Sequence, residues 1–237
     1  MFVPIQTPKA RLCRRIGRES RPYGQGFLGF NAFIVGAAIY LGLVTNAGAA
    51  PDQLRILALG DSLTAGYGLS QADSFPARLA TALRDSGIAA EIVNAGVSGD
   101  TTSGALQRLD WLMDKPYDLA IVELGANDAL RAVDPGVTEK NLSLIVDKLK
   151  DSGAAVLLAG MKAPRNLGPD FARAFDGIFP GIAKRNGVAF YPFFLDGVAA
   201  YPDLNQQDGM HPNAKGVTII VERILPFVIK ALGKDDK

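Results

Sequence analysis

Hydrophobic residues along the chain form short continuous runs that alternate with longer segments of helical spacing. Continuous apolar runs are typical of strands that are buried on both faces of a parallel sheet. Strands that alternate with helices predict an α/β fold, in which helices cover both faces of that sheet. The runs that predict strands are residues 54–59, 90–95, 119–124, 155–159 and 188–194.

Segments with apolar residues at every third or fourth position predict the helices between these strands. Gly87 and Gly153 mark the ends of two helices, because glycine readily takes the backbone conformation that follows a helix. Within the fourth helix, residues 177–180 predict a break or kink, since a proline there has no N–H to donate. The predicted helices are residues 75–86, 102–113, 138–151, 169–186 and 214–232.

The first 49 residues differ from the rest in charge and hydropathy. They hold six Lys or Arg and one Glu, and an almost wholly apolar run at residues 27–44 precedes Ala47-Gly48-Ala49. This order predicts a signal peptide at residues 1–49 with a cleavage site after the small residues. The apolar run also reaches the lower limit of a membrane span, so an uncleaved anchor is the alternative. Both interpretations place the remaining chain in the periplasm or outside the cell.

Composition narrows the classes of partner and cofactor. Residues 50–237 hold 19 basic and 23 acidic residues, a mildly acidic balance that argues against nucleic acid as a partner. The one cysteine, Cys13, would be lost with the signal peptide, which would exclude disulfides and cysteine chemistry. A zinc site wants three or four ligands, and His211 is the only histidine. We therefore expect no metal and no cofactor, although carboxylates alone remain possible ligands.

In open parallel sheets, ligands bind beyond the carboxyl ends of the strands, so catalytic residues are expected in the loops at that edge. Ser62 follows the first strand near the start of a helix, where backbone N–H groups favour negative charge. Ser and Asp are also ordinary helix-capping residues. Thr64 departs from the Gly-x-Ser-x-Gly turn of α/β-hydrolases, because it replaces the second glycine.

The last of these loops contains Asp208 and His211, three residues apart. A hydroxyl nucleophile needs a base, and the base needs a group that holds its tautomer. A single histidine is usually structural, but this one lies beside an acid at the expected active edge. We therefore take Ser62, Asp208 and His211 as the candidate catalytic residues.

Acyl transfer also needs donors for an oxyanion. Gly99 lies in one edge loop and offers a backbone N–H without side-chain hindrance, and Asn127 lies in another and offers a side-chain amide. Each also has a structural interpretation, as a turn glycine and as a turn or capping residue.

Together, four segments resemble the sequence blocks of the SGNH (GDSL) hydrolase family over residues 54–232. They are Gly60-Asp61-Ser62-Leu63, Gly99, Gly125-Ala126-Asn127-Asp128 and Asp208-Gly209-Met210-His211-Pro212. Residues 50–237 are thus similar to an SGNH hydrolase domain, which implies a flavodoxin-like, three-layer α/β/α fold with five parallel strands. Within the family the chain looks most like bacterial periplasmic esterases of the thioesterase I, lysophospholipase and arylesterase group.

The resemblance implies roles for these residues. Ser62 would attack the acyl carbon of an ester or thioester, His211 would move its proton, and Asp208 would orient His211. The Ser62 and Gly99 N–H groups and the Asn127 amide would hold the oxyanion. Asp61 and Asp128 would hold loops, and no metal or cofactor is implied. From loop position, Tyr67, Leu130 and residues 162–168 are expected to line the acyl groove.

Other functions stay open on the sequence. A carbohydrate O-acetyl esterase shares the fold and the catalytic residues, and an acyltransferase shares the acyl-enzyme. A non-catalytic lipid- or ligand-binding module would use the same scaffold, although no candidate catalytic position is replaced here. We expect a monomer that acts on a small-molecule acyl ester or thioester and keeps no stable membrane partner after signal cleavage.

Overall fold

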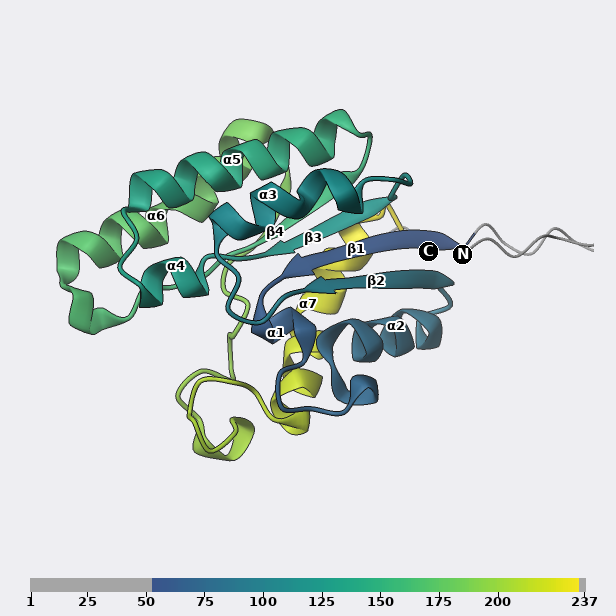
Figure 1. Ribbon diagram of the computed structural model, residues 1–237. Coiled ribbons are helices and arrows are strands. Elements are labelled where there is room, and N and C mark those ends of the chain that lie inside the picture. The colour runs from purple at the N-terminus through teal and green to yellow at the C-terminus, as the bar shows by residue number, and fades with distance from the viewer. Residues whose placement is uncertain (1–52, 235–237) are drawn as a thin grey trace, which may run out of the picture. The chain divides into compact units, whose positions relative to one another are not determined.

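A five-stranded sheet lies at the centre of the computed structural model, which describes residues 53–234 (Figure 1). Every neighbouring pair of strands is parallel, and their order is β2-β1-β3-β4-β5. This confirms the predicted sheet, whereas the signal-peptide prediction for residues 1–49 lies outside the described residues. The strands are β1 (Leu54–Gly60), β2 (Ala90–Gly96), β3 (Leu119–Glu123), β4 (Ala155–Ala159) and β5 (Ala189–Tyr191).

Helices cover both faces of the sheet, as the alternating pattern predicted (Figure 1). On one face lie α2 (Phe75–Asp85) and α7 (Ala214–Ala231), which contact each other. On the other lie α3 (Thr102–Leu112), α5 (Pro135–Asp151) and α6 (Pro169–Asn186). Among residues 53–234, no helix combines the length and the hydropathy needed to cross a membrane.

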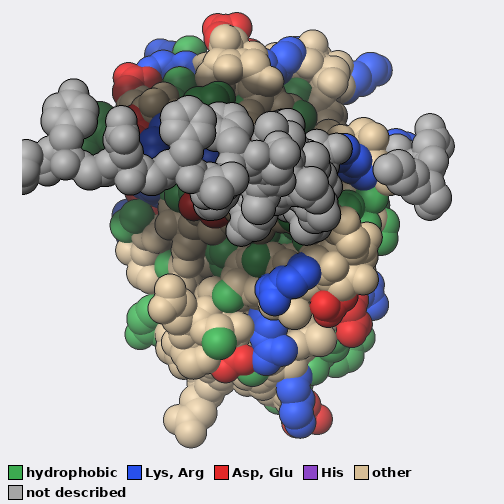
Figure 2. Space-filling model, turned by 90° about the vertical axis from the view of Figure 1, so that its right-hand side faces the viewer, with side chains coloured by type: hydrophobic (Ala, Val, Ile, Leu, Met, Phe, Trp, Pro, Cys, Tyr) green, Lys and Arg blue, Asp and Glu red, His purple; other side chains and the backbone are tan. Residues whose placement is uncertain are grey.

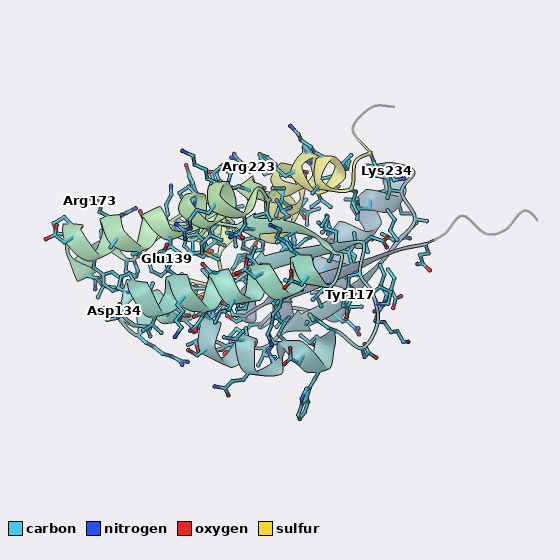
Figure 3. All side chains as sticks on the ribbon, turned by 90° about the horizontal axis from the view of Figure 1, so that it is seen from above. Tyr117, Asp134, Glu139, Arg173, Arg223 and Lys234 are labelled. Atoms are coloured by element: carbon cyan, nitrogen blue, oxygen red, sulfur yellow. The ribbon has the colours of Figure 1, made fainter. Side chains whose placement is uncertain are left out.

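The start of α5 shows how local sequence sets a helix boundary. The Asp134 side chain accepts a hydrogen bond from the Gly136 N–H, and Pro135 occupies the first turn, where its missing N–H costs nothing. Seen from above, α5 runs beside α6, and Glu139 lies between the two helices (Figure 3). Arg185 of α6 donates a 2.6 Å hydrogen bond to the Glu139 carboxylate. The cap sets the start of α5, and the ion pair joins α5 to α6 within the same layer.

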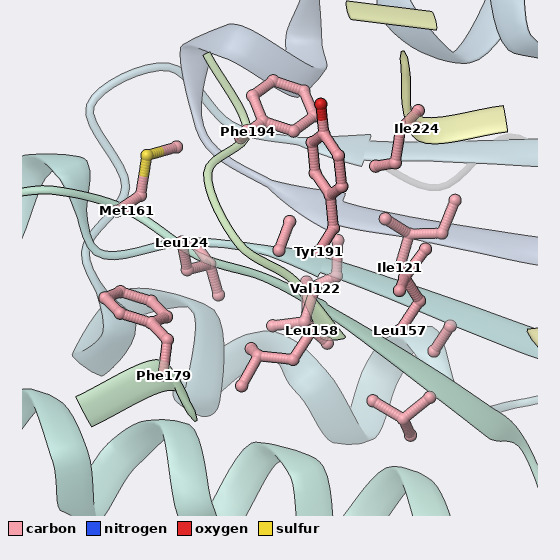
Figure 4. Close-up of a cluster of buried hydrophobic side chains, with 14 of the residues drawn as sticks. Ile121, Val122, Leu124, Leu157, Leu158, Met161, Phe179, Tyr191, Phe194 and Ile224 are labelled. Atoms are coloured by element: carbon pink, nitrogen blue, oxygen red, sulfur yellow. The ribbon is translucent and has the colours of Figure 1, made fainter. Parts of the chain in front are cut away.

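The hydrophobic core lies on both faces of the central strands. Side chains of β3 and β4 such as Val122 and Leu158 are fully buried in this core, as are Phe179 of α6 and Ile224 of α7 (Figure 4). Burying one such aliphatic side chain stabilises a fold by roughly 1.5–3 kcal/mol relative to leaving it exposed. The continuous apolar runs of the sequence therefore reflect strands covered by helices on both sides.

Charged side chains are mixed on the surface where the strands begin. The view in Figure 2 shows Lys and Arg among Asp, Glu and hydrophobic side chains on this face, without one patch of a single sign.

Two predicted elements differ from the structure. The fifth strand ends at Tyr191 rather than at residue 194, because Pro192 has no N–H and the chain turns after it. The predicted break in α6 is wrong: the helix continues from Pro169 to Asn186. Pro180 faces solvent there, while one face of the helix stays buried on both sides of it.

Short helices after the strands were not predicted from the sequence. They are too short for a periodic pattern, but they occupy the edge where the candidate residues lie (Figure 1). They are α1 (Ser62–Ala65), η1 (Gln71–Asp73), α4 (Ala126–Leu130), η2 (Arg165–Leu167) and η3 (Pro202–Leu204).

Candidate active site

Ser62 is the first residue of α1, at the carboxyl end of β1. The preceding residue, Asp61, is fully buried and caps this helix by accepting a 3.0 Å hydrogen bond from the Leu63 N–H. The turn leaves no room for a side chain at Gly60, where a Cβ would lie 2.1 Å from Thr64 Oγ1. The tight turn therefore places Ser62 at the edge of the sheet with its backbone N–H at a helix start.

His211 and Asp208 approach Ser62 from the loop before α7. The distance from Ser62 Oγ to His211 Nε2 is 2.9 Å, and the distance from His211 Nδ1 to Asp208 Oδ2 is 2.7 Å. With the proton on Nδ1, which the carboxylate favours, Nε2 is free to accept the hydroxyl proton of Ser62. The three predicted catalytic residues are thus brought together in the order nucleophile, base and acid.

Asp208 is held in its ionised form by hydrogen bonds from its own loop. Asp208 Oδ1 accepts from the backbone N–H groups of His211, at 3.0 Å, and Met210, at 2.9 Å. The His211 backbone N–H, followed by the His211 side chain and the Met210 N–H, lowers the pKa of Asp208 to about 2. A carboxylate that stays charged at neutral pH favours the imidazolium that forms when His211 takes a proton.

The two other predicted oxyanion donors line the same cavity of the structure as Ser62, which is described below. Gly99 has a φ of +81°, a conformation that suits glycine, and its carbonyl accepts a 2.8 Å hydrogen bond from Arg131. Asn127 follows Gly125, which takes a φ of +110° as α4 begins. Asn127 Nδ2 donates one hydrogen bond to Asp61 Oδ2 at 3.0 Å, which leaves its second amide hydrogen for a ligand.

Asp128, by contrast, holds the scaffold. It is fully buried and accepts hydrogen bonds from the Thr102 backbone N–H, at 2.9 Å, and the Thr102 hydroxyl, at 2.6 Å. These bonds tie α4 to the start of α3. Because Gly99 lies just before α3 and Asn127 lies on α4, Asp128 keeps the two oxyanion loops together.

A third buried carboxyl group, Glu123, contacts Asp61 and was not identified from the sequence. Glu123 Oε2 accepts a 2.7 Å hydrogen bond from the Thr64 hydroxyl and a longer one, 3.4 Å, from the Asp61 N–H. Burial, and then the charge of Asp61, raise the pKa of Glu123 well above its usual value. Burial likewise raises the pKa of Asp61 to about 6. The only signal in the sequence is a glutamate at the end of an apolar strand.

A cavity of about 910 Å³ opens above Ser62 and His211. Tyr67 and Leu130, both predicted groove residues, line it, and the Tyr67 ring centroid lies 4.6 Å from that of His211. Of the predicted loop 162–168, Lys162 to Arg165 reach the cavity. Further apolar lining comes from Leu63, Met161, Phe193 and Leu195. The site is therefore a mostly apolar hollow with the reactive hydroxyl at its base.

Two aromatic residues that follow β5 do not line this cavity. Phe194 is fully buried in the core, while Tyr201 is exposed and lines a neighbouring cavity of about 400 Å³. Within residues 53–234, no group of three or more His, Cys, Asp or Glu side chains is arranged to hold a metal ion.

Comparison with known proteins decides the family. The model of the GDSL-like lipase/acylhydrolase family matches residues 58–219, which contain all the candidate catalytic residues. The chain belongs to this family. The chain is also similar to the "Arylesterase" of Vibrio mimicus, which is 38% identical over 179 residues, or 75% of this chain and 90% of the relative.

Two further GDSL-family relatives support the assignment. The "Thioesterase 1/protease 1/lysophospholipase L1" of Escherichia coli K12 is 38% identical over 185 residues, 78% of this chain and 86% of the relative. The crystal structure of AlinE4, described as an SGNH-hydrolase family esterase, is 49% identical, covers 78% of this chain and 99% of AlinE4, and superposes with a TM-score of 0.66. The chain is thus a hydrolase of the GDSL/SGNH esterase type with the fold of that family.

Proposed function

We propose that this protein is a serine esterase that hydrolyses carboxylic esters and thioesters through an acyl-enzyme on Ser62. The observation that carries the proposal is the 2.9 Å contact between Ser62 Oγ and His211 Nε2 at the base of an apolar cavity. Family membership supplies the reaction class, and the contact supplies the nucleophile and its base.

In the first half of the reaction, Ser62 Oγ attacks the acyl carbon while its proton passes to His211 Nε2. The carbonyl oxygen becomes an oxyanion, which accepts hydrogen bonds from the Ser62 and Gly99 N–H groups and the free amide hydrogen of Asn127. The bond to the alcohol or thiol then breaks, and the leaving group takes the proton from His211. The acyl group remains esterified to Ser62.

In the second half, water replaces the leaving group. His211 takes a proton from the water as the water oxygen attacks the acyl-enzyme, and the same donors hold the second oxyanion. The bond to Ser62 Oγ breaks, and the hydroxyl recovers its proton from His211. The carboxylic acid leaves, and the enzyme returns to its starting state with Asp208 ionised throughout.

The cavity favours substrates larger than acetyl esters. Its volume of about 910 Å³ lies near the upper end of the roughly 300–1,000 Å³ range of small-molecule sites. Apolar side chains such as Leu130 and Phe193 line it, which suits an acyl chain or an aryl group. Relatives named as an arylesterase and as a thioesterase and lysophospholipase support the same substrate classes.

We also propose that residues 1–49 direct export, so that the enzyme acts in the periplasm or outside the cell. The arginines, the apolar run and Ala47-Gly48-Ala49 support this. The mass of the protein recovered after expression of the full chain in a bacterial host tests it. A product that begins near residue 50 supports a cleaved signal, and an intact chain in the cytoplasm contradicts export.

The test of the activity uses protein purified after expression of the full chain, beside Ser62→Ala. p-Nitrophenyl esters from acetyl to dodecanoyl, and an acyl-CoA thioester followed by thiol release, are the substrates. We expect hydrolysis of both classes by the parent, none by Ser62→Ala, and rates that do not collapse beyond acetyl. Hydrolysis confined to acetyl groups would favour a carbohydrate O-acetyl esterase instead. Equal rates in parent and variant would refute the proposal.

A further inference from the structure

Gln206 lies in the loop that carries His211, and its side-chain amide uses both of its hydrogens. Gln206 Nε2 donates a 2.7 Å hydrogen bond to the Tyr67 carbonyl and a 3.0 Å hydrogen bond to the Pro212 carbonyl. Its backbone N–H donates a 2.7 Å hydrogen bond to the carbonyl of His211. One residue thus bonds to the backbone of His211 and Pro212 and also to Tyr67, which lies on the nucleophile side of the site.

These bonds join two segments that are far apart in the sequence. Tyr67 follows the short helix that starts at Ser62, whereas Gln206 is 139 residues away in the sequence, in the loop before α7. In the described structure, the segments 61–70 and 203–213 share two hydrogen bonds: the one from Gln206 to Tyr67 and the one between Ser62 and His211. The Ser62–His211 hydrogen bond changes during the proposed reaction, because its proton is transferred. The Gln206–Tyr67 hydrogen bond therefore remains to hold the two segments together.

The neighbouring backbone passes close to the Gln206 side chain. Gly68 has a φ of +73°, and a Cβ at this position would lie 2.2 Å from Gln206 Oε1. The positive φ favours glycine at this position, and a side chain there would push against the Gln206 amide. The two ends of the His211 loop are joined by the Gln206–His211 backbone hydrogen bond and by a β-bridge between Asn205 and Pro212. Residues 207–210 between them are exposed and have no regular secondary structure.

We propose that Gln206 is a positioning residue, which holds the His211 loop against the Ser62 loop so that Nε2 stays within hydrogen-bond reach of Oγ. The inference rests on the proposed serine mechanism. Asp208 bonds to its own loop and to His211, so the acid–base pair moves as one unit when this tie is lost. A displacement of about 1 Å at a reacting group costs up to about 100-fold in rate.

The test compares Gln206→Met with Gln207→Met in the full enzyme, using a short p-nitrophenyl ester. Methionine keeps the approximate length of glutamine and removes its hydrogen bonds without adding charge. Gln207 is the matched control, because it is the exposed neighbour and does not line the main cavity. For Gln206→Met we expect kcat to fall by at least about tenfold, with KM changed by less than about threefold.

The pH dependence of kcat/KM distinguishes a positioning role of Gln206 from unfolding of the His211 loop. Because Asp208 and His211 move together, we expect the acidic midpoint of the kcat/KM profile to stay at the parent value in Gln206→Met. An unchanged kcat in Gln206→Met would overturn the proposal. So would a shifted midpoint together with a lower melting temperature, which would indicate that the loop unfolds. Activity retained by Ser62→Ala would instead refute the serine mechanism itself. That result can be told apart from a failure of the Gln206 proposal, because it comes from a different variant.

A second route uses the close contact at Gly68. Gly68→Ala places a methyl group against the Gln206 amide, and its backbone strain is the same in any background. In a double-mutant cycle with Gln206→Ala, the Gly68→Ala substitution should reduce kcat less than it does in the parent. Equal reductions in the two backgrounds would show that Gly68 and Gln206 act independently, contrary to the proposal.

Discussion

Asn127 donates its side-chain hydrogen bond to Asp61, the residue that precedes Ser62, over 3.0 Å. The same Asp61 carboxyl group caps the helix of Ser62 through the Leu63 N–H. One buried carboxyl group therefore orients both the proposed nucleophile and one of the proposed oxyanion donors. The acid that looks like a plain neighbour of the serine in the sequence connects two loops that meet only in the fold.

Replacing Asp61 by asparagine should lower kcat without removing the fold. The new Oδ1 can still accept from Leu63, but the new amide N–H₂ faces the amide of Asn127, which must then turn away. We expect kcat to fall by about tenfold or more. The loss should stay smaller than the roughly 10²–10³-fold loss that follows deletion of an oxyanion donor. Steady-state kinetics of Asp61→Asn, with the exposed Asp85→Asn as control, measure the effect. Equal kcat values for the two variants would contradict it.

The raised pKa of Asp61 also predicts how stability depends on pH. Burial raises this pKa from 3.8 to about 6, so the folded state holds the proton more tightly than the unfolded state. The stabilisation that results is fully present below pH 3.8 and is lost as pH rises through 6. At about 1.4 kcal/mol per pKa unit, the change is on the order of 3 kcal/mol.

Urea unfolding at several pH values between 4 and 7 measures this dependence. The free energy of unfolding of the parent should fall, relative to that of Asp61→Asn, as pH rises over this range. Asp85→Asn, at an exposed position on α2, should follow the parent. Parallel curves for the parent and Asp61→Asn would show that Asp61 has no raised pKa in the folded state.

Asn127→Ala should lower kcat and leave substrate binding nearly unchanged. In the proposed mechanism the amide holds the oxyanion, which exists only during the reaction, so kcat should fall by ~10²–10³-fold with a modest change in KM. Initial rates over a range of ester concentrations separate the two constants. An unchanged kcat would remove Asn127 from the oxyanion site.

Changes at the acid–base pair should leave the fold intact. His211→Ala removes the base, and Asp208→Asn removes the charge that favours the Nδ1 tautomer, a change that costs up to about 10⁴-fold in a serine protease. Both side chains lie in a loop at the edge of the sheet, so circular dichroism and the melting temperature should stay close to those of the parent. An unfolded His211→Ala protein, or one with parental kcat, would contradict the assignment.

The elements and the candidate residues were predictable to different degrees. Strands such as β1 and β4 were predicted closely, because burial on both faces leaves continuous apolar runs in the sequence. The end of β5 was predicted wrongly because Pro192 stops the strand, and the break in α6 was predicted wrongly because the buried face of α6 continues on both sides of the exposed Pro180. Ser62, Asp208 and His211 were predicted to meet because Ser62 follows the first strand and the only histidine lies beside an acid in a loop expected at the same edge.

Glu123 and Gln206 carry no such mark in the sequence. Glu123 contacts Thr64, 59 residues away, and Gln206 contacts Tyr67, 139 residues away. Both contacts depend on which loops the parallel sheet brings to one edge, and no local pattern records that arrangement. The roles of these two residues are therefore visible only in the folded chain.

The formation of an acyl-enzyme on Ser62 is the central claim, and trapping it tests the claim most directly. The parent and Ser62→Ala are mixed with a slowly deacylating aryl ester, quenched in acid, and analysed by intact mass and peptide mapping. We expect the parent to gain the mass of one acyl group on the peptide that contains Ser62, while Ser62→Ala gains none. An acyl group on another residue, or equal labelling of both proteins, would contradict the mechanism.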